Sequence, residues 1–245
     1  MADDIDLLAI QLRTLFRLTG TGRIEGENDP DRSPGPRFWL AGCASGNVFA
    51  VRADVDDAIA GEIAVIAATE PPFVEPDRLP RHIDRYLELL SRAAPPPSPG
   101  LGLTYNLPHG LRHDGNTMLV DGDSPNGRRL HGVLSAQGMP GGLAELGFRS
   151  VSDLWSPWCA AMVGGEMAAV AFAARLSADG AELGVTTARA FRGRGHAAAV
   201  AAGWSRLPPL RSRTLFYSTD QANGSSQRVV ARLGLRFIGS SLRLA

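Results

Sequence analysis

The sequence predicts an α+β fold, in which helices pack on one mixed sheet, and three observations support this class. The chain has 245 residues, of which 44% are hydrophobic and 20% charged, and this is enough apolar material for a substantial core. Segments with a strand-like period alternate with segments with a helical period. From residue 158 onward these segments follow in the order β-β-β-α-β-α-β, which predicts a mixed sheet with helices packed on it.

An α+β pattern also fills the first 110 residues. The first predicted helix carries Ile5, Leu8 and Leu12 at helical spacing, so one of its faces is apolar. Gly46 separates two apolar runs and predicts a turn between two strands. Pro80 is tolerated in the first turn of a helix, so the last helix of this region is predicted to begin just before it. In chain order, we expect a helix over 4–18, strands over 38–43 and 47–52, and helices over 54–67 and 79–92.

The middle of the chain has the least regular pattern. The run Pro95–Gly100 breaks regular structure, either as an interdomain linker or as a rigid loop. We favour the loop, because another strand is predicted directly after it, ahead of a domain boundary that we place between residues 112 and 113. The predicted elements are strands over 101–107 and 116–120, a turn-rich stretch over 121–129, and one or two short helices within 130–146, broken at 138–142.

A clearer pattern begins at residue 158. Gly164-Gly165 predicts a tight turn between the first two strands, and Ala178-Asp179-Gly180 predicts a turn before the third. Leu207-Pro208-Pro209 ends one helix, and Gly234 ends the next at its C′ position. We expect strands over 158–163, 167–175, 181–187 and 213–219, helices over 197–204 and 223–233, and a last segment over 235–244 that is one kinked strand or two short ones.

The segment from Arg192 to Ala197 predicts a phosphate site. It has the sequence Arg-Gly-Arg-Gly-His-Ala and lies between a predicted strand and a predicted helix. Glycines let backbone N–H groups approach an anion closely, and a helix N-terminus adds unpaired N–H donors and the positive end of its dipole. The alanine-rich helix that follows is slim enough for a bulky ligand to lie against it, although close packing on the sheet explains the same alanines.

The charge distribution favours an anionic ligand at this end of the chain. The formal net charge is zero, yet residues 181–245 hold ten arginines and only two acidic residues, Glu182 and Asp220. This third of the chain is therefore strongly basic. Few aromatic residues lie among these arginines, so nucleic acid is not an expected partner.

The remaining composition argues against several classes of protein. No apolar run reaches the ~20 residues that span a bilayer, and the acidic start lacks the basic stretch of a signal peptide, so we expect a cytoplasmic protein without membrane contact. Cys43 and Cys159 are expected as buried reduced thiols. His109 and His113 lie four residues apart, but Gly110 opposes a helix that would align them, so we expect no metal site. The chain contains no lysine, which indicates the coding bias of a GC-rich bacterium.

Two landmarks from about residue 115 onward resemble the GNAT superfamily of N-acetyltransferases. That family's pyrophosphate signature is Arg or Gln, two residues, Gly, one residue, then Gly or Ala, and the segment Arg192–Ala197 fits it. Its second landmark, Asn-x-x-Ser and then a terminal Gly-Phe, is similar to Asn223–Ser226 followed by Gly234-Leu235, with Leu in place of Phe. The resemblance implies a GNAT-type acyltransferase fold for residues 113–245 and acetyl-CoA as the cofactor. It also implies transfer of the acetyl group to an amine by direct attack in a ternary complex.

The resemblance implies roles for individual residues as well. Many family members use a strand glutamate as the general base for the incoming amine, and Glu182 occupies that position. The family often has a tyrosine acid four residues after the serine. Val230 stands there instead, so Tyr217 or Ser218 is the substitute, or no side-chain acid is used. The residues implied to hold acetyl-CoA are Val185, Thr186, Thr187, Arg192, Gly193, Arg194, Gly195, His196, Ala197, Ala198, Asn223 and Ser226.

Two other functions stay open at this point. The pattern Gly193-x-Gly195-x-x-Ala198 also satisfies a dinucleotide fingerprint, with Asp220 after the next strand. Against it, five residues separate the loop from its strand, and too little chain follows for the rest of a doubly wound sheet. The chain could also be a non-catalytic acyl-CoA-binding regulatory protein, an interpretation that Val230 favours.

The acceptor is expected to be an amine on a small molecule or a peptide, which the sequence does not identify further. Trp155, Trp158, Tyr105 and Phe148 are candidates to line its pocket, with core packing as the alternative. We expect the N-terminal region, residues 1–112, to pack on the acetyltransferase domain and to shape the acceptor side of the cleft. A homodimer is left open.

Overall fold

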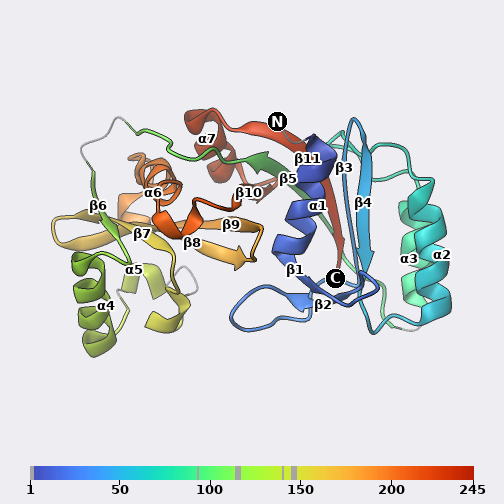
Figure 1. Cartoon of the computed structure of the whole chain (residues 1–245), viewed down its shortest axis with the longest axis horizontal. Helices are drawn as coiled ribbons and strands as arrows, with labels where there is room; N and C mark the ends of the chain where they lie inside the picture. Colours follow the sequence, from blue (N-terminus) through green and yellow to red (C-terminus); the bar gives the residue numbers. More distant parts are fainter. Residues whose placement is uncertain (1–2, 93, 114–116, 140, 145–147) are drawn as a thin grey trace.

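A nine-stranded sheet with helices on both faces forms the centre of the protein (Figure 1). The computed structural model describes residues 3–92, 94–113, 117–139, 141–144 and 148–245. The helices are α1 (Asp4–Leu15), α2 (Asp57–Ala68), α3 (Ile83–Ser91), α4 (Pro125–Gln137), α5 (Gly141–Ala144), α6 (His196–Trp204) and α7 (Gly224–Leu233). The strands of the sheet are β3 (Phe38–Cys43), β4 (Gly46–Val51), β5 (Pro99–Asn106), β6 (Met118–Asp121), β7 (Trp158–Val163), β8 (Glu166–Leu176), β9 (Gly180–Thr187), β10 (Thr214–Asp220) and β11 (Arg236–Leu244).

The strand order joins both ends of the chain in one sheet. The order is β4-β3-β11-β5-β10-β9-β8-β7-β6, and neighbouring strands are antiparallel except β9 and β10, which are parallel. The predicted α+β class with a mixed sheet is therefore confirmed. Strand β5 lies between β10 and β11, so the boundary predicted after residue 112 falls between strands that share this sheet.

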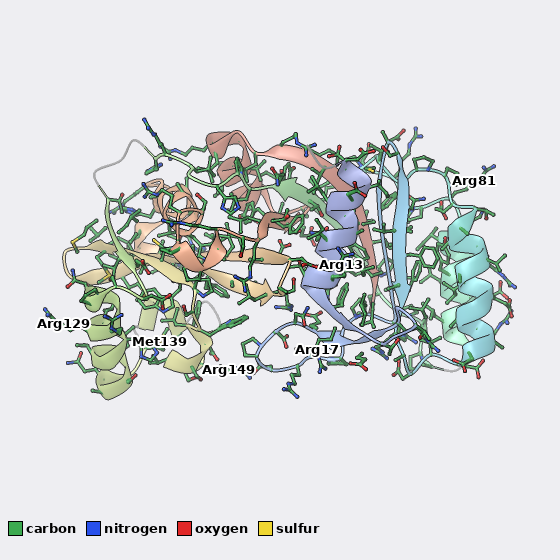
Figure 2. All side chains as sticks on the ribbon, in the orientation of Figure 1. Arg13, Arg17, Arg81, Arg129, Met139 and Arg149 are labelled. Atoms are coloured by element: carbon green, nitrogen blue, oxygen red, sulfur yellow. The ribbon has the colours of Figure 1, made fainter. Side chains whose placement is uncertain are left out.

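Side-chain alternation divides the core between the two faces of the sheet. Leu101 and Leu103 lie two residues apart on β5 and so point to the same face, where Leu101 packs with α2 and α3 and Leu103 packs with α6 and α7. On the opposite face, Trp39 packs with α1, and Trp158 packs with α4. Side chains occupy the space between the helices and the sheet (Figure 2). Each face thus carries two groups of helices, one over each half of the sheet.

Several predicted boundaries are wrong because contacts distant in sequence set them. The first helix ends at Leu15 rather than 18, because Phe16–Leu18 forms a strand, β1, that pairs with β2 (Ile24–Glu27) in a small separate sheet. Helix α3 begins at Ile83 rather than before Pro80. The backbone N–H groups ahead of it donate to the buried Glu70 carboxylate, which holds that stretch outside the helix.

The middle of the chain contains a longer helix than predicted. The stretch predicted as turn-rich contains the start of α4, because the Ser124 hydroxyl accepts the Gly127 N–H and Pro125 fits the first turn. The predicted strand over 116–120 begins outside the described residues, and β6 covers Met118–Asp121. The last segment is one strand, β11, with a register shift between Phe237 and Gly239.

Helix α6 packs unusually close to the sheet. A Cβ atom at Gly203 would lie 2.6 Å from the Cys159 sulfur and 2.8 Å from Leu119, so this position has no room for a side chain. All residues of α6 from Ala198 to Trp204 are buried. The small residues of α6 therefore do serve close helix–sheet packing. Among the described residues, no helix is long and apolar enough to cross a membrane.

Candidate functional site

Strands β9 and β10 part from each other halfway along the sheet. Their parallel ladder has three partner pairs and ends at Glu182 and Phe216. Beyond this point β9 continues against β8 as far as Thr187, and β10 continues against β5 as far as Asp220. The two strands thus form a fork, and one backbone edge of residues 183–187 has no strand partner within the described chain.

The glycine-rich loop closes one end of the fork. Gly193 and Gly195 have φ values of +79° and +85°, a left-handed conformation that L side chains rarely adopt. Gly195 is the N-cap of α6 and supplies no side-chain cap, so the helix begins without a side-chain partner for its first N–H groups. Unpaired N–H groups at a helix N-terminus favour an anion such as a phosphate.

A cavity of about 570 Å³ fills the space between the fork, this loop and the start of α7, and we call it the fork cavity. All the residues that the sequence implied for acetyl-CoA line it except Arg194. Arg194 instead stacks over the Phe191 ring, with its guanidinium carbon 5.9 Å from the ring centre. Phe191, Tyr217, Ser225, Arg228, Val229 and Arg232 complete the lining.

The fork cavity is electropositive. Arg192, Arg228 and Arg232 line it, and none of its described lining residues is acidic. Arg228 and Arg232 come from successive turns of α7 and were missed at the sequence level, although their spacing of four places them on one helical face. The Arg232 guanidinium lies against Gly195, where an added Cβ would meet it at 2.6 Å. An anionic ligand here would meet three guanidinium groups besides the helix N-terminus.

Helix α7 supplies the other wall of the fork cavity. The Asn223 side chain accepts the Ser226 backbone N–H at 3.1 Å, so it is the N-cap of α7 as well as a lining residue. Tyr217 also lines the cavity, and burial raises the pKa of its hydroxyl, while a hydrogen bond with Ser226 acts in the opposite direction. Val230 is buried in the core and does not line the cavity, so the position that resembles the family's acid has a packing role.

Glu182 lies at the branch point of the fork, but on the opposite face of β9. Its side chain is buried and does not line the fork cavity. One carboxylate oxygen accepts the Ser218 backbone N–H at 2.6 Å, and the other accepts the Gln11 side-chain amide at 3.3 Å. Burial raises the pKa of Glu182, and these hydrogen bonds partly oppose that shift. The sequence did not indicate Gln11, because its partners lie far along the chain.

A second cavity, of about 230 Å³, opens on the same face as Glu182, and we call it the aromatic cavity. Phe148, Trp155 and Phe172 line it, so two of the four aromatic residues predicted for an acceptor pocket lie together. The Phe172 ring lies directly on Gly184 of β9, where an added Cβ would be 2.6 Å from the ring. The Phe172 ring therefore separates the aromatic cavity from β9, on the face opposite the fork cavity.

Charged residues from the N-terminal region form part of the aromatic cavity. Asp29 and Asp31 line it together with Asp153, Arg149 and Arg175. Arg149, which is labelled in Figure 2, pairs with Asp31 at 2.8 Å. Asp29 lies 3.6 Å from Arg175. Desolvation lowers the pKa of Arg175 to about 10. Residues 29–31 of the N-terminal region thus meet residues 148–175 around one cavity.

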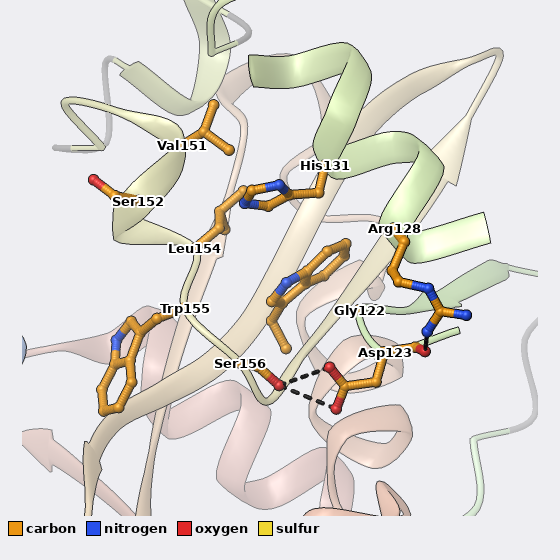
Figure 3. Close-up of a pocket in the computed structure, with 10 residues that line it drawn as sticks. Gly122, Asp123, Arg128, His131, Val151, Ser152, Leu154, Trp155 and Ser156 are labelled. Carbon is orange, nitrogen blue, oxygen red and sulfur yellow. Dashed lines mark hydrogen bonds between the residues drawn. The ribbon is translucent and has the colours of Figure 1, made fainter. Parts of the chain in front are cut away.

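A third cavity, of about 390 Å³, lies beside α4 at the far edge of the sheet. Figure 3 shows the Ser156 hydroxyl donating to the Asp123 carboxylate, at 2.9 and 3.1 Å, and His131 directed toward Leu154. Trp158, another predicted acceptor residue, lines this cavity. The fourth, Tyr105, lies in the core and donates to Gln227 at 3.0 Å.

The predicted cysteine and histidine positions are spatially separate. Cys43 and Cys159 are buried free thiols, and burial raises the pKa of Cys159 to about 12. The His109 ring bonds to the Arg213 backbone carbonyl at 2.9 Å. Within the part of the chain that the structure describes, no three His, Cys, Asp or Glu side chains are grouped as metal ligands.

Comparison with known proteins finds similarity at the level of structure. No protein-family model and no curated protein sequence matches the chain. A GCN5-related N-acetyltransferase from Kribbella flavida aligns with 100% of this chain and 95% of its own, at 13% identity and a TM-score of 0.48. One from Sphaerobacter thermophilus aligns over 87% and 76%, at 14% identity and a TM-score of 0.42.

A GNAT-family acetyltransferase from Colwellia psychrerythraea aligns with 60% of this chain, at 17% identity and a TM-score of 0.41. The match spans 56% of that protein, little more than half of its length. At these identities the likeness concerns the fold alone.

Proposed function

We propose that this protein is an N-acetyltransferase that moves an acetyl group from acetyl-CoA to an amine. The observation that carries the proposal is the fork, whose unpaired β9 edge leads directly to the glycine-rich loop and the N-terminus of α6. An extended pantetheine arm has amide groups that can pair with such an edge, and a pyrophosphate matches the helix start and its arginines. The fork cavity offers both environments in one continuous space.

The reaction that we propose is direct attack of the amine on the thioester. A C–N bond forms, the C–S bond breaks, the amine loses a proton, and CoA leaves as the thiol. A backbone N–H on residues 185–187 would stabilise the oxygen of the thioester carbonyl, an effect of about 2.7–4 kcal/mol per donor. Tyr217, which lines the fork cavity beside Ser226, is the candidate to protonate the leaving sulfur.

We place the acceptor in the aromatic cavity. It lies on the face opposite the fork cavity, where the Phe172 ring covers Gly184, so an amine there would approach β9 without displacing the cofactor. Asp29 and Asp31 in its wall support the expectation that the N-terminal region shapes the acceptor side.

A non-catalytic acyl-CoA-binding protein is the second candidate. Two observations favour it: Val230 packs in the core, and the Glu182 carboxylate is buried away from the fork cavity. Both functions use the same cofactor cavity, so binding alone does not distinguish them.

The test is acetyl-CoA binding by calorimetry, followed by thiol release from acetyl-CoA across a panel of amines. Both cysteines are buried, so a thiol reagent should report free CoA with little background from the native protein. Binding with release on at least one amine supports the proposal. Binding without release on any amine indicates the regulatory function, and binding of a nicotinamide dinucleotide in place of acetyl-CoA overturns both.

A further inference from the structure

At the branch point of the fork, a side chain takes the place of a backbone hydrogen-bond acceptor. The Thr214 N–H donates across to the Asp179 carbonyl at 2.9 Å, so alternate N–H groups of β10, at 214, 216 and 218, face β9. A regular parallel ladder would continue with the Ser218 N–H donating to a β9 carbonyl. Instead, this N–H donates to the Glu182 side chain at 2.6 Å. The carboxylate therefore lies where the ladder would otherwise have closed.

A buried side chain from the N-terminal helix holds this carboxylate in place. Gln11 of α1 donates to Glu182 at 3.3 Å and to the Ser218 hydroxyl at 2.7 Å, and its own carbonyl accepts the Thr104 hydroxyl at 3.1 Å. Gln11 is 1% exposed and Thr104 is fully buried. We call Gln11, Thr104, Glu182 and Ser218 the fork cluster. It joins α1 and strands β5, β9 and β10 at one point.

The chemistry of the fork cluster favours an open fork. The Glu182 side-chain oxygen already satisfies the Ser218 N–H, so this group gains nothing by bonding to a β9 carbonyl instead. A buried carboxylate without its donors would be costly, so Gln11 is needed to keep Glu182 in this position. Arg175 adds a favourable charge from β8.

We propose that Glu182, oriented by Gln11, is a positioning residue that keeps β9 and β10 apart and so maintains the fork cavity on the other face of the sheet. The expectation that this positioning role affects acetyl-CoA binding rests on the proposed function. The role itself does not require the carboxylate to touch the amine. It gives the N-terminal helix a part in cofactor binding, although α1 contributes no residue to the lining of the fork cavity.

The test compares three substitutions in the full-length protein, with CoA as the probe. Glu182→Gln keeps an oxygen that can accept the Ser218 N–H, and CoA affinity should stay within about twofold of the wild type. Glu182→Leu removes the acceptor, and affinity should fall by about tenfold to a hundredfold as the ladder closes. The CoA affinity of Gln11→Leu should lie between those of the other two variants. In the double variant, Gln11→Leu should add little to the loss caused by Glu182→Leu, because both substitutions act on one contact.

Thr14→Val is the matched control. Thr14 is fully buried on the same helix, and its hydroxyl donates to the Ile10 carbonyl rather than to the fork cluster. This variant should lose stability and keep its CoA affinity. If it loses as much affinity as Gln11→Leu, general loosening of α1 explains the result and the proposal is wrong.

Amide hydrogen exchange separates this proposal from the proposed function. In Glu182→Leu, exchange should slow at those residues of 183–187 whose N–H groups gain bonds in the closed ladder, and Glu182→Gln should match the wild type. This readout holds even if the wild type binds no CoA, a result that would overturn only the proposed function. If Glu182→Leu does not fold, exchange and CoA affinity are compared between Gln11→Leu and the wild type instead. Unchanged exchange and affinity in the folded variants contradict the positioning role.

Discussion

Gly184 shows how a single missing side chain leaves room for an aromatic ring on one face of β9. The Phe172 ring lies so close to it that a Cβ atom would meet three ring carbons at 2.6–2.9 Å. The backbone of Gly184 is ordinary strand, so the requirement is for space and not for a left-handed conformation. The ring also forms an edge contact with Phe148, at 5.4 Å between centres, and so cannot simply move aside into that neighbour.

We therefore expect Gly184→Ala to destabilise the protein by about 1–3 kcal/mol, because it overpacks this contact. Once an acceptor is known, the KM for the acceptor should rise more than the KM for acetyl-CoA, since Phe172 lines the aromatic cavity. Urea unfolding and steady-state kinetics measure both effects. Gly61→Ala is the control: Gly61 lies in α2 with nothing within 4 Å, so alanine should stabilise by about 0.5–1 kcal/mol. Equal effects at the two positions would contradict the packing argument.

Glu182 gives a second prediction, on pH. Burial raises its pKa in the folded protein above the ordinary value of 4.5, so folding favours the protonated carboxyl. The stability that this group contributes is complete below the unfolded pKa and is lost as pH rises through the folded pKa.

The free energy of unfolding of Glu182→Gln, minus that of the wild type, should therefore increase as the pH rises above the ordinary pKa of 4.5. Urea titrations of both proteins at a series of pH values measure this difference, in which the other titrating groups cancel. A difference that decreases with pH would mean that the carboxylate is stabilised by its donors more than it is destabilised by burial.

At the scale of elements, the start of α7 combines a structural and a binding role in Asn223. Its side chain caps the helix, and it lines the fork cavity. Asn and Asp cap helices about equally well, but only Asp brings a negative charge to a cavity whose described charged lining residues are all arginines.

Asn223→Asp should keep the melting temperature, yet lower CoA affinity by about threefold to tenfold, with the loss shrinking at high salt. Asn223→Ala should lower stability by about 1 kcal/mol through the lost cap. Calorimetry at two salt concentrations and thermal unfolding measure these effects. An Asp variant that binds CoA as tightly as the wild type at low salt would argue against a phosphate-bearing ligand in the fork cavity.

The elements themselves were largely predictable where local pattern decides. Turns at Gly46, at Gly164-Gly165 and at Gly234 lie where the sequence placed them, because positive φ or a helix end demands glycine there. The glycine-rich loop was identified for the same reason. The start of α3 was not predictable, because the residues before it donate to the Glu70 carboxylate, which is distant in sequence.

At the scale of the whole molecule, β5 is central to the sheet although its sequence lies outside the region that resembles acetyltransferases. It pairs with β10 on one side and with most of β11 on the other. Side-chain period shows which face of a strand is buried, but not which strand lies beside it. Strand neighbours and the Gln11–Glu182 contact, 171 residues apart, were therefore beyond sequence reasoning.

Residues 113–245 expressed alone should fail to fold, because β10 and β11 would each expose an inner edge where β5 belongs. Circular dichroism and an amide NMR spectrum of this fragment test the prediction. Co-expression of residues 1–112 should restore solubility by supplying the missing strand. A soluble fragment with dispersed amide signals would show that the C-terminal region forms an independent domain.

The place of β11 also dictates an order of assembly. Phe38 is paired with Leu244, so two strands that are neighbours in the sheet are synthesised far apart in time. Until residues 236–244 have been synthesised, β3 and β5 each expose an unpaired edge where β11 will bind. Such long-range closure is slow relative to local folding. The nascent chain should therefore depend on a chaperone that shields this edge, and a ribosome stalled before residue 236 would present an aggregation-prone intermediate.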